Sequence, residues 1–305
     1  MLDSEDGLEN CVDAPSPPPK RAFYDFSVSP FSYDFLAFIG MARAAGCTET
    51  VFVPGERDYQ KCSPEQQRFR LKTLMVPLAE MSGTCIVAKT REEAITLVLP
   101  DCFPIGYTVE KPIMAHMFGQ IIRSGKGLWL KASPKAQQRV AAYLGQRRPI
   151  TMTIRDSDIK PLRNSNLPEW LEAARQLQKD GHDVLFVPDT DHPDRFFEGF
   201  DSYPEAAIEP DLRAALYAHS LLNLGIGNGP MGLCFYSALP YFIFRMQDER
   251  FQECSADFLA KHSLPVGSQA PWCRPHQGIV WEPDESEVIV RHVREWVSKF
   301  KQEAA

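Results

Sequence analysis

The sequence lacks the features that would place the chain in a membrane or in an oxidising compartment. No apolar run in its 305 residues approaches the roughly 18–20 residues that a membrane-spanning helix needs. The first ten residues, MLDSEDGLEN, are acidic and contain no apolar stretch of the kind found in secretory signals. The eight cysteines are scattered without a CxxC pair, which favours reduced, buried thiols over a disulfide framework or a zinc site. We therefore expect a cytoplasmic protein with no transmembrane segment.

Several motifs that would identify an enzyme class directly are also absent. There is no GxSxG nucleophile elbow, no HExxH helix and no P-loop. Six of the seven histidines show no metal-ligand spacing, and the seventh, His192, lies in the loop that begins at Asp189. The formal net charge of −7 argues against non-specific nucleic-acid binding, so no nucleic-acid partner is expected.

The composition and length indicate a globular protein of two domains. Hydrophobic residues make up 44% and charged residues 24% of the chain, and 305 residues are long for one domain. Residues 1–20 are acidic and then proline-rich, which predicts a disordered tail. The strand and helix pattern restarts near Gly145–Pro149. We therefore expect an N-terminal domain over 21–147 and a C-terminal domain over 148–305.

Strands alternate with helices in the first domain. The periodicity predicts strands over 22–29, 49–55 and 84–89, and helices over 31–45, 62–82, 90–98, 113–125 and 133–144. Thr90 and Ser133 are the expected N-caps of their helices, and Pro77 should kink or end the second helix. Such β-α-β units are typical of a parallel sheet.

The second domain alternates more cleanly. Strands are predicted over 150–155, 182–190, 206–208, 221–227, 241–245 and 278–281, and helices over 167–179, 210–219, 251–262 and 284–300, with a short helix ending at Ser237. The fold class predicted for the whole chain is α/β, with two Rossmann-like domains. Ligands of such folds bind at the carboxyl ends of the strands.

A glycine-rich loop lies between two apolar strands in Leu221–Arg245 and contains a literal GxGxxG at Gly227–Gly232. Its glycines permit positive φ and close backbone approach, and a helix start behind it would offer N–H groups to a phosphate. Tight strand–helix packing is a second explanation. An NAD site is a third, which the late position of the loop and the absence of an acidic residue closing the next strand disfavour.

Two polar loops complete the candidate site. The first follows the strand that ends in Arg155 and carries Arg163, Asn164 and Asn166. Arginine forks suit phosphate oxygens and amides suit sugar hydroxyls, although Asn166 could simply cap the next helix. The second loop begins at Asp189, whose carboxylate could act as acid, base or metal ligand, or simply shape a turn.

The strand ending TIR, the loop RNSN, the strand VLFVPDT and the later LGIGNGPMGL resemble the C-terminal domain of GT-B-fold glycosyltransferases of the heptosyltransferase-like and fucosyltransferase-like groups. In those groups a strand early in that domain ends in a basic residue, and a later one leads into an SGP or NGP loop that opens a helix. The first domain matches only in its β-α alternation. By this resemblance a nucleotide-diphosphate sugar would contact Arg155, Asn228, Gly229, Pro230 and Met231. The full predicted donor site adds the loop residues Arg163, Asn164, Asn166, Asp189 and Gly227.

The resemblance implies transfer of a sugar from that donor to a glycan or other hydroxyl acceptor, with no cofactor and no obligatory metal. Arg155 would help to neutralise the diphosphate, and closure of the two domains would exclude water. The general base would come from the first domain, with Asp25 and Asp34 as the candidates. Peripheral association with a membrane assembly is compatible with such an activity.

Three alternatives remain open from the sequence. The same fold serves sugar 2-epimerases. A non-catalytic binding or scaffold protein in polysaccharide assembly would share the fold without turnover. An NAD(P)-dependent oxidoreductase would use the glycine loop for a dinucleotide.

Overall fold

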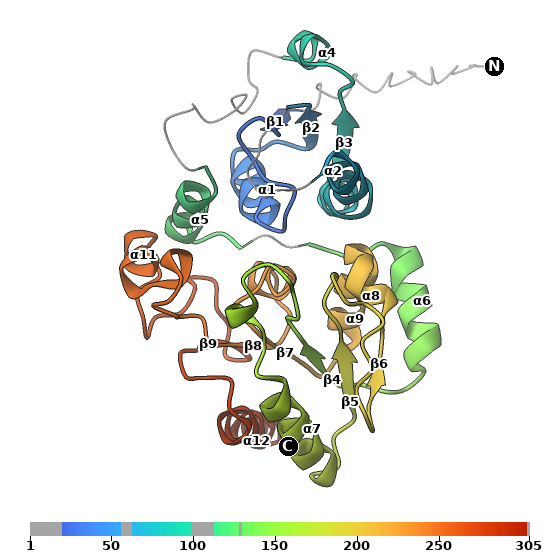
Figure 1. Ribbon diagram of the computed structural model, residues 1–305, viewed down its shortest axis with the longest axis vertical. Helices are drawn as coiled ribbons and strands as arrows, with labels where there is room; N and C mark the ends of the chain where they lie inside the picture. The colour runs from blue at the N-terminus through green and yellow to red at the C-terminus, as the bar shows by residue number, and fades with distance from the viewer. Residues whose placement is uncertain (1–19, 56–62, 99–112, 128–129, 304–305) are drawn as a thin grey trace, which may run out of the picture.

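The computed structural model describes residues 20–55, 63–98, 113–127 and 130–303. Figure 1 shows two α/β units, one around a small sheet near the N-terminus and one around a larger sheet formed by the rest of the chain. No helix among the described residues is long and apolar enough to cross a membrane. The predicted N-terminal tail lies outside the described residues except for Lys20.

The first sheet has three parallel strands in the order β1-β2-β3. They are β1 (Arg21–Asp25), β2 (Glu49–Val53) and β3 (Thr84–Val87). Helix α1 (Phe35–Ala44) connects the first two strands. The ring of Tyr24 meets those of Phe35 and Phe38 edge-on, with centroids 4.7 and 5.0 Å apart, so aromatic contacts hold α1 on the sheet.

The second connection is a long helix with an irregular middle. It consists of α2 (Pro64–Arg70), a π-helical segment (Leu71–Met75) and α3 (Val76–Glu80). Ser63 and Gln66 form a capping box at its start. Pro77 has no N–H to donate, and the wider π turn just before it accommodates that loss. The predicted kink therefore appears as a local widening.

Three more helices follow before the second sheet: α4 (Arg91–Thr96), α5 (Ile113–Ser124) and α6 (Pro134–Leu144). The predicted caps are confirmed, because the side chains of Thr90 and Ser133 each accept a hydrogen bond from a backbone N–H of the first turn.

The second sheet has six parallel strands in the order β6-β5-β4-β7-β8-β9. They are β4 (Ile150–Thr153), β5 (Val184–Val187), β6 (Asp201–Ser202), β7 (Leu222–Ile226), β8 (Tyr241–Phe244) and β9 (Gln277–Val280). The chain builds outward from β4 in one direction and then from β7 in the other, as in Rossmann folds. The strand order reverses between the neighbouring strands β4 and β7, and this position is called the switch point. Ligands of such sheets bind there, between the loops that follow the two strands.

Helices cover both faces of this sheet. Helices α7 (Leu167–Lys179) and α12 (Ser286–Glu303) pack against each other and against one face of the sheet. Apolar residues such as Trp170 and Ile289 form this contact. The others are α8 (Glu205–Ile208), α9 (Pro210–His219), α10 (Gly232–Phe235) and α11 (Ala256–Lys261). On the face toward the first sheet, the hydroxyls of Thr153 and Tyr217 lie 2.7 Å apart, which joins β4 to α9.

Two sequence expectations are wrong here. Residues 206–208 belong to helix α8, and the short strand lies earlier, at β6. The helix expected over 251–262 divides into a 3₁₀ turn (Gln252–Cys254) and α11, because the Ser255 side chain caps a new helix start.

One continuous apolar core joins the two units. It contains buried residues of α1, α5 and α6 together with residues of α9 and α10. Helix α6, which precedes the predicted boundary at 147, packs against α9, and its Ser133 hydroxyl donates to Asp211 at 2.6 Å. The position of the boundary stays a prediction.

Candidate functional site

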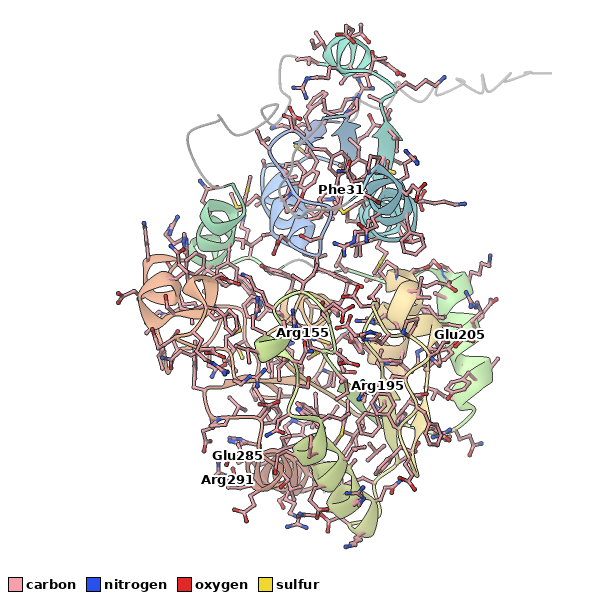
Figure 2. The ribbon with its side chains drawn as sticks, in the orientation of Figure 1. Phe31, Arg155, Arg195, Glu205, Glu285 and Arg291 are labelled. Carbon is pink, nitrogen blue, oxygen red and sulfur yellow. The ribbon has the colours of Figure 1, made fainter. Side chains whose placement is uncertain are left out.

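A cavity of about 530 Å³, called the cleft below, separates the first sheet's helices from the carboxyl edge of the second sheet. From the first unit it is lined by Ser32, Tyr33, Asp34, Gln66, Phe69, Arg70, Thr73 and Leu74. From the second it is lined by Arg155, Ser157, Ile159, Arg163, Asp189, Thr190, Asp191, Ile208, Asn228, Gly229 and Pro230. Figure 2 shows Arg155 in the middle of the molecule, whereas Glu285 and Arg291 lie far below it.

Arg155 is held rigidly at the end of β4. Its guanidinium donates to the Ile159 carbonyl at 2.5 Å, to the Lys160 carbonyl at 3.2 Å and to the Asn164 side chain. Burial in the cleft wall lowers the pKa of Arg155, and the charge of Arg163 adds to that effect. No carboxylate forms an ion pair with Arg155 among the described residues. The cleft therefore holds a fixed positive charge that a bound anion would stabilise.

Arg163 reaches the cleft as well, but it already has partners. It pairs with Glu253 at 3.1 Å and donates to the Gly227 carbonyl at 3.1 Å. Lys160 pairs with the same Glu253 carboxylate. These contacts connect the loops that follow β4, β7 and β8. Arg163 thus fixes the glycine loop more than it offers a free charge.

The predicted amides play supporting parts. The side-chain oxygen of Asn164 accepts from Arg155 and from the Ser157 N–H at 3.0 Å, which orients the arginine. Asn166 is the N-cap of α7 but makes no side-chain cap bond, and its backbone N–H donates to Asp284 at 2.9 Å. Neither residue lines the cleft.

Asp189 lies on the cleft wall after β5. Its two carboxylate oxygens accept from the backbone N–H groups of Asp156 and Asp191, both at 3.0 Å. This is the turn chemistry that the sequence allowed as an alternative. No group of three or more metal-ligating side chains occurs in the part of the chain that the structure describes.

The glycine loop approaches the first unit closely. A Cβ at Gly229 would lie 2.9 Å from Cβ of Tyr33, and one at Gly232 would lie 2.8 Å from Leu36. No glycine of this loop has positive φ, so that expectation is wrong and close packing is the reason for these residues. Met231 is buried and lies outside the cleft.

The anion-binding role expected of the following helix is reduced. Helix α10 has four residues, and the N–H groups of Met231 and Gly232 already bond within the loop, to Asn228 Oδ1 and to the Gly229 carbonyl. The N–H groups of Asn228 and Gly229 have no hydrogen-bond partner among the described residues. Both residues line the cleft, so these two donors remain for a ligand.

The two candidate bases of the first unit differ sharply. Asp25 is 4% exposed and lies outside the cleft. Burial raises the pKa of Asp25, but hydrogen bonds from Arg91 and Ser27 outweigh it, so the pKa lies below the usual value. Its oxygens accept from Arg91 at 2.7 and 2.8 Å, which leaves Asp25 poorly suited to take a proton.

Asp34 is exposed within the cleft at the start of α1. The surrounding cleft walls desolvate its carboxylate and raise its pKa, while the Ser32 hydroxyl, which donates at 2.9 Å, and the charge of Arg163 oppose the shift. A raised pKa strengthens a carboxylate as a base near neutral pH. The structure therefore favours Asp34.

A second, smaller cavity of about 190 Å³ adjoins the cleft behind the glycine loop. Gly227 lines it together with apolar side chains of Phe118, Phe235, Met246 and Leu259. Tyr33 and the Asn228–Gly229 pair line both cavities. Arg163 also lines both cavities and Glu253 lines the smaller one, so the loop separates the cleft from a space whose walls are mostly apolar.

The sequence did not identify the lining residues of the first unit other than Asp34. One face of α2 and of the π segment lines the cleft, through Gln66, Phe69, Arg70 and Thr73. In sequence this face resembles the solvated side of a helix. Phe69 is a signal of a binding surface there, because a large apolar side chain on an otherwise polar helix face is unusual. In the structure this side chain is exposed.

A dinucleotide site fits this geometry poorly. The first turn of the six-stranded sheet, after β4, is the Arg155 loop and has no glycine. The GxGxxG instead follows β7, on the other side of the switch point from β4, and leads into a helix of one turn.

No protein-family model matches this chain, and no curated protein matches its sequence. Among solved structures, a glycosyl transferase family 9 protein from Veillonella parvula superposes with a TM-score of 0.55 at 9% identity, covering 92% of this chain and 98% of its own. The E. coli ADP-heptose LPS heptosyltransferase II gives 0.50 at 9% identity, covering 94% and 100%. The chain therefore has the GT-B fold, with two α/β units facing each other across a cleft.

Proposed function

We propose that this chain transfers a sugar from a nucleotide-diphosphate donor to a hydroxyl acceptor in the cleft. The carrying observation is that one cavity holds Arg155, without a carboxylate partner among the described residues, and the accessible carboxylate of Asp34. Solved structures with this fold include proteins described as glycosyl transferases. A glycan acceptor, a cytoplasmic location and independence of metal ions belong to the proposal.

Arg155 and the loop donors would act on the leaving group. As the bond between the sugar's anomeric carbon and the diphosphate breaks, negative charge grows on the diphosphate oxygens. The Arg155 guanidinium and the free N–H groups of Asn228 and Gly229 line the cavity where that charge would develop. Preorganised donors of this kind stabilise a transition state because they need no rearrangement when charge appears.

Asp34 would act on the acceptor. The acceptor hydroxyl forms the new bond to the anomeric carbon and gives its proton to the Asp34 carboxylate. The raised pKa of Asp34 favours this transfer, because a carboxylate at its ordinary pKa is a weak base at neutral pH. The apolar cavity beside the loop offers aromatic walls to the uncharged part of the donor.

The test is a screen of nucleotide-diphosphate sugars in the presence of a mixture of hydroxyl acceptors. Turnover is measured as release of nucleoside diphosphate, and donor binding is measured by calorimetry. Arg155→Gln should lower turnover about 10²-fold or more, since removal of one preorganised donor typically has that effect. Arg291→Gln is the matched control, because Arg291 is exposed at the far end of the molecule.

Full turnover by Arg155→Gln would refute the assigned role. Donor binding without release of product by the wild-type protein would indicate a non-catalytic binding protein instead. Binding of NAD(P) in place of nucleotide sugars would favour the oxidoreductase alternative.

A further inference from the structure

A third cavity, of about 620 Å³ and distinct from the cleft and from the smaller cavity beside it, lies where the two units meet. It is called the seam cavity below. It is lined by Gly40, Arg43, Ala44, Met81, Ser82, Gly125, Lys126, Gly127, Lys131 and Trp272. Helix α1 reaches the cleft with its first end and this cavity with its last turn. No described residue lines both cavities, so the two cavities are separate.

The charge of the seam cavity is one-sided. Arg43, Lys126 and Lys131 line it, and no carboxylate does among the residues that the structure describes. None of the three forms an ion pair among the described residues. The cleft, by contrast, is lined by three aspartates as well as three arginines. In a chain of net charge −7, three uncompensated cations around one cavity repel one another unless an anion lies between them.

Arg43 is fixed in place for such a contact. Its guanidinium donates to the Cys47 carbonyl and, at 3.2 Å, to the Ser82 hydroxyl. Its Nε is buried and has no hydrogen-bond partner in the part of the chain that the structure describes. Burial lowers the pKa of Arg43, but both of its hydrogen-bond partners are neutral oxygens, so its charge has no carboxylate partner among the described residues. Each terminal nitrogen keeps one further hydrogen that can be donated to a phosphate oxygen. Lys126 and Lys131 are exposed at the rim and can adjust to a ligand.

The opposite side of the cavity is apolar. The indole N–H of Trp272 donates to the Phe235 carbonyl at 2.6 Å, which fixes the ring. Gly127 passes so close that a Cβ there would lie 3.1 Å from the Trp272 ring. Met81 adds a flexible apolar side chain. A ligand with an anionic group and a less polar body would therefore find a surface for each part.

We propose that the seam cavity binds a small organic phosphate. Its phosphate would lie among Arg43, Lys126 and Lys131, and its body against Trp272 and Met81. The volume of about 620 Å³ falls in the range of small-molecule sites and exceeds what a bare phosphate ion fills. Since Arg43 belongs to the first unit and Trp272 to the second, the ligand contacts both. This site is independent of the activity proposed for the cleft.

The experiment measures binding of glucose 6-phosphate and of inorganic pyrophosphate by calorimetry to the full-length chain. The double variant Lys126→Gln/Lys131→Gln should weaken glucose 6-phosphate binding about tenfold or more, because two charge-assisted contacts are lost. Both lysines are exposed, so the fold should persist. Lys135→Gln is the matched control, since Lys135 is exposed nearby and does not line the cavity.

A second pair of variants separates the two cavities. Arg155→Gln should leave glucose 6-phosphate binding unchanged, since Arg155 lines only the cleft. Arg43→Lys keeps the charge but loses the fork, and it should weaken binding without abolishing it. Absence of binding to the wild-type protein, or binding that is lost in Arg155→Gln and retained in the double lysine variant, would overturn the proposal. These binding measurements do not depend on whether the protein uses a nucleotide sugar as a substrate in the cleft.

Discussion

The two walls of the cleft hold their charged groups in different ways. On the wall from the second sheet, Arg155 has three hydrogen-bond acceptors and Asp189 accepts from two backbone N–H groups, so both side chains are locked. On the wall from the first sheet, the Asp34 carboxylate accepts a hydrogen bond from Ser32 alone among the described side chains, and it is open to the cavity. Fixed charges suit binding of a diphosphate, and an accessible carboxylate suits proton transfer. Under the proposed function, the wall from the second sheet binds the donor and the wall from the first sheet carries the base.

The sharpest test of this division is Asp34→Asn, which keeps the shape of the side chain and removes its basicity. Turnover should fall about 10²–10⁴-fold, the usual contribution of a general base, while donor binding by calorimetry stays near the wild-type value. Glu65→Gln provides the control, because Glu65 is exposed on α2 and does not line the cleft. Unchanged turnover in Asp34→Asn would assign the base elsewhere.

The contact between the walls is tested by Gly229→Ala. The new Cβ would lie 2.9 Å from Cβ of Tyr33, so the loop and the start of α1 must move apart. A displacement of this size at a reacting geometry reduces kcat up to about 10²-fold. Steady-state kinetics and a thermal melt are measured together. A normal kcat in a folded variant would show that the spacing of the walls does not matter for catalysis.

Arg91→Gln tests the other carboxylate of the first unit. It leaves the buried Asp25 without its cation, and the free energy of unfolding at neutral pH should fall by about 1–3 kcal/mol, less than for a fully buried pair because Arg91 is 46% exposed. Urea denaturation measures the change. Donor turnover by the folded variant should stay normal, since Asp25 lies outside the cleft.

The pH dependence of that variant has a definite sign. In the wild-type protein the pKa of Asp25 is lowered on folding, so its contribution to stability is present above the unfolded pKa and is lost as the pH falls through the folded pKa. Without Arg91, two of the contributions that lower the pKa of Asp25 are lost, so that pKa is higher in the variant than in the wild-type protein. The stability difference between the two proteins should therefore narrow on acidification; a constant difference would contradict the assigned pairing.

The smallest expected effect is that of Ser32→Ala. The hydroxyl hydrogen bond lowers the pKa of Asp34, so its loss should raise that pKa further. Because a base must be deprotonated, the acid limb of kcat/KM should move to higher pH, by a fraction of a unit for one exposed hydrogen bond. A pH profile that does not move, or that moves to lower pH, would show that the acid limb of kcat/KM does not report the titration of Asp34.

The fold was largely predictable because strands and helices alternate with clear punctuation. Every strand of the two sheets except β6 overlaps a predicted strand, and Ser133 and Thr90 cap helices as expected. Strand β6 has two residues, too few to show a pattern. Helix α8 was missed for the same reason, since Glu205–Ile208 is a single turn. The pairing order of the strands could not be derived from local pattern.

The candidate site was predictable on one wall only. Residues that follow buried parallel strands must lie at one edge of the sheet, so Arg155, Asp189 and Asn228 could be grouped from the sequence. Gln66, Phe69 and Arg70 lie on a helix whose neighbour is another part of the chain, and no local pattern identifies that neighbour. Asp25 and Asp34 were indistinguishable in sequence, because only the fold brings Arg91 to the first and the cavity to the second.

The apolar core shared by the two units has a consequence for how the protein can move and unfold. Leu36 of α1 packs on the chain at Gly232, and α5 lies against α1 within the same core as α9 and α10. A hinge opening that separated the units would bring this core into water at about 25 cal/mol for each Å² exposed. Access to the cleft therefore depends on its loops more than on rigid-body opening, and the two units should melt as one cooperative body.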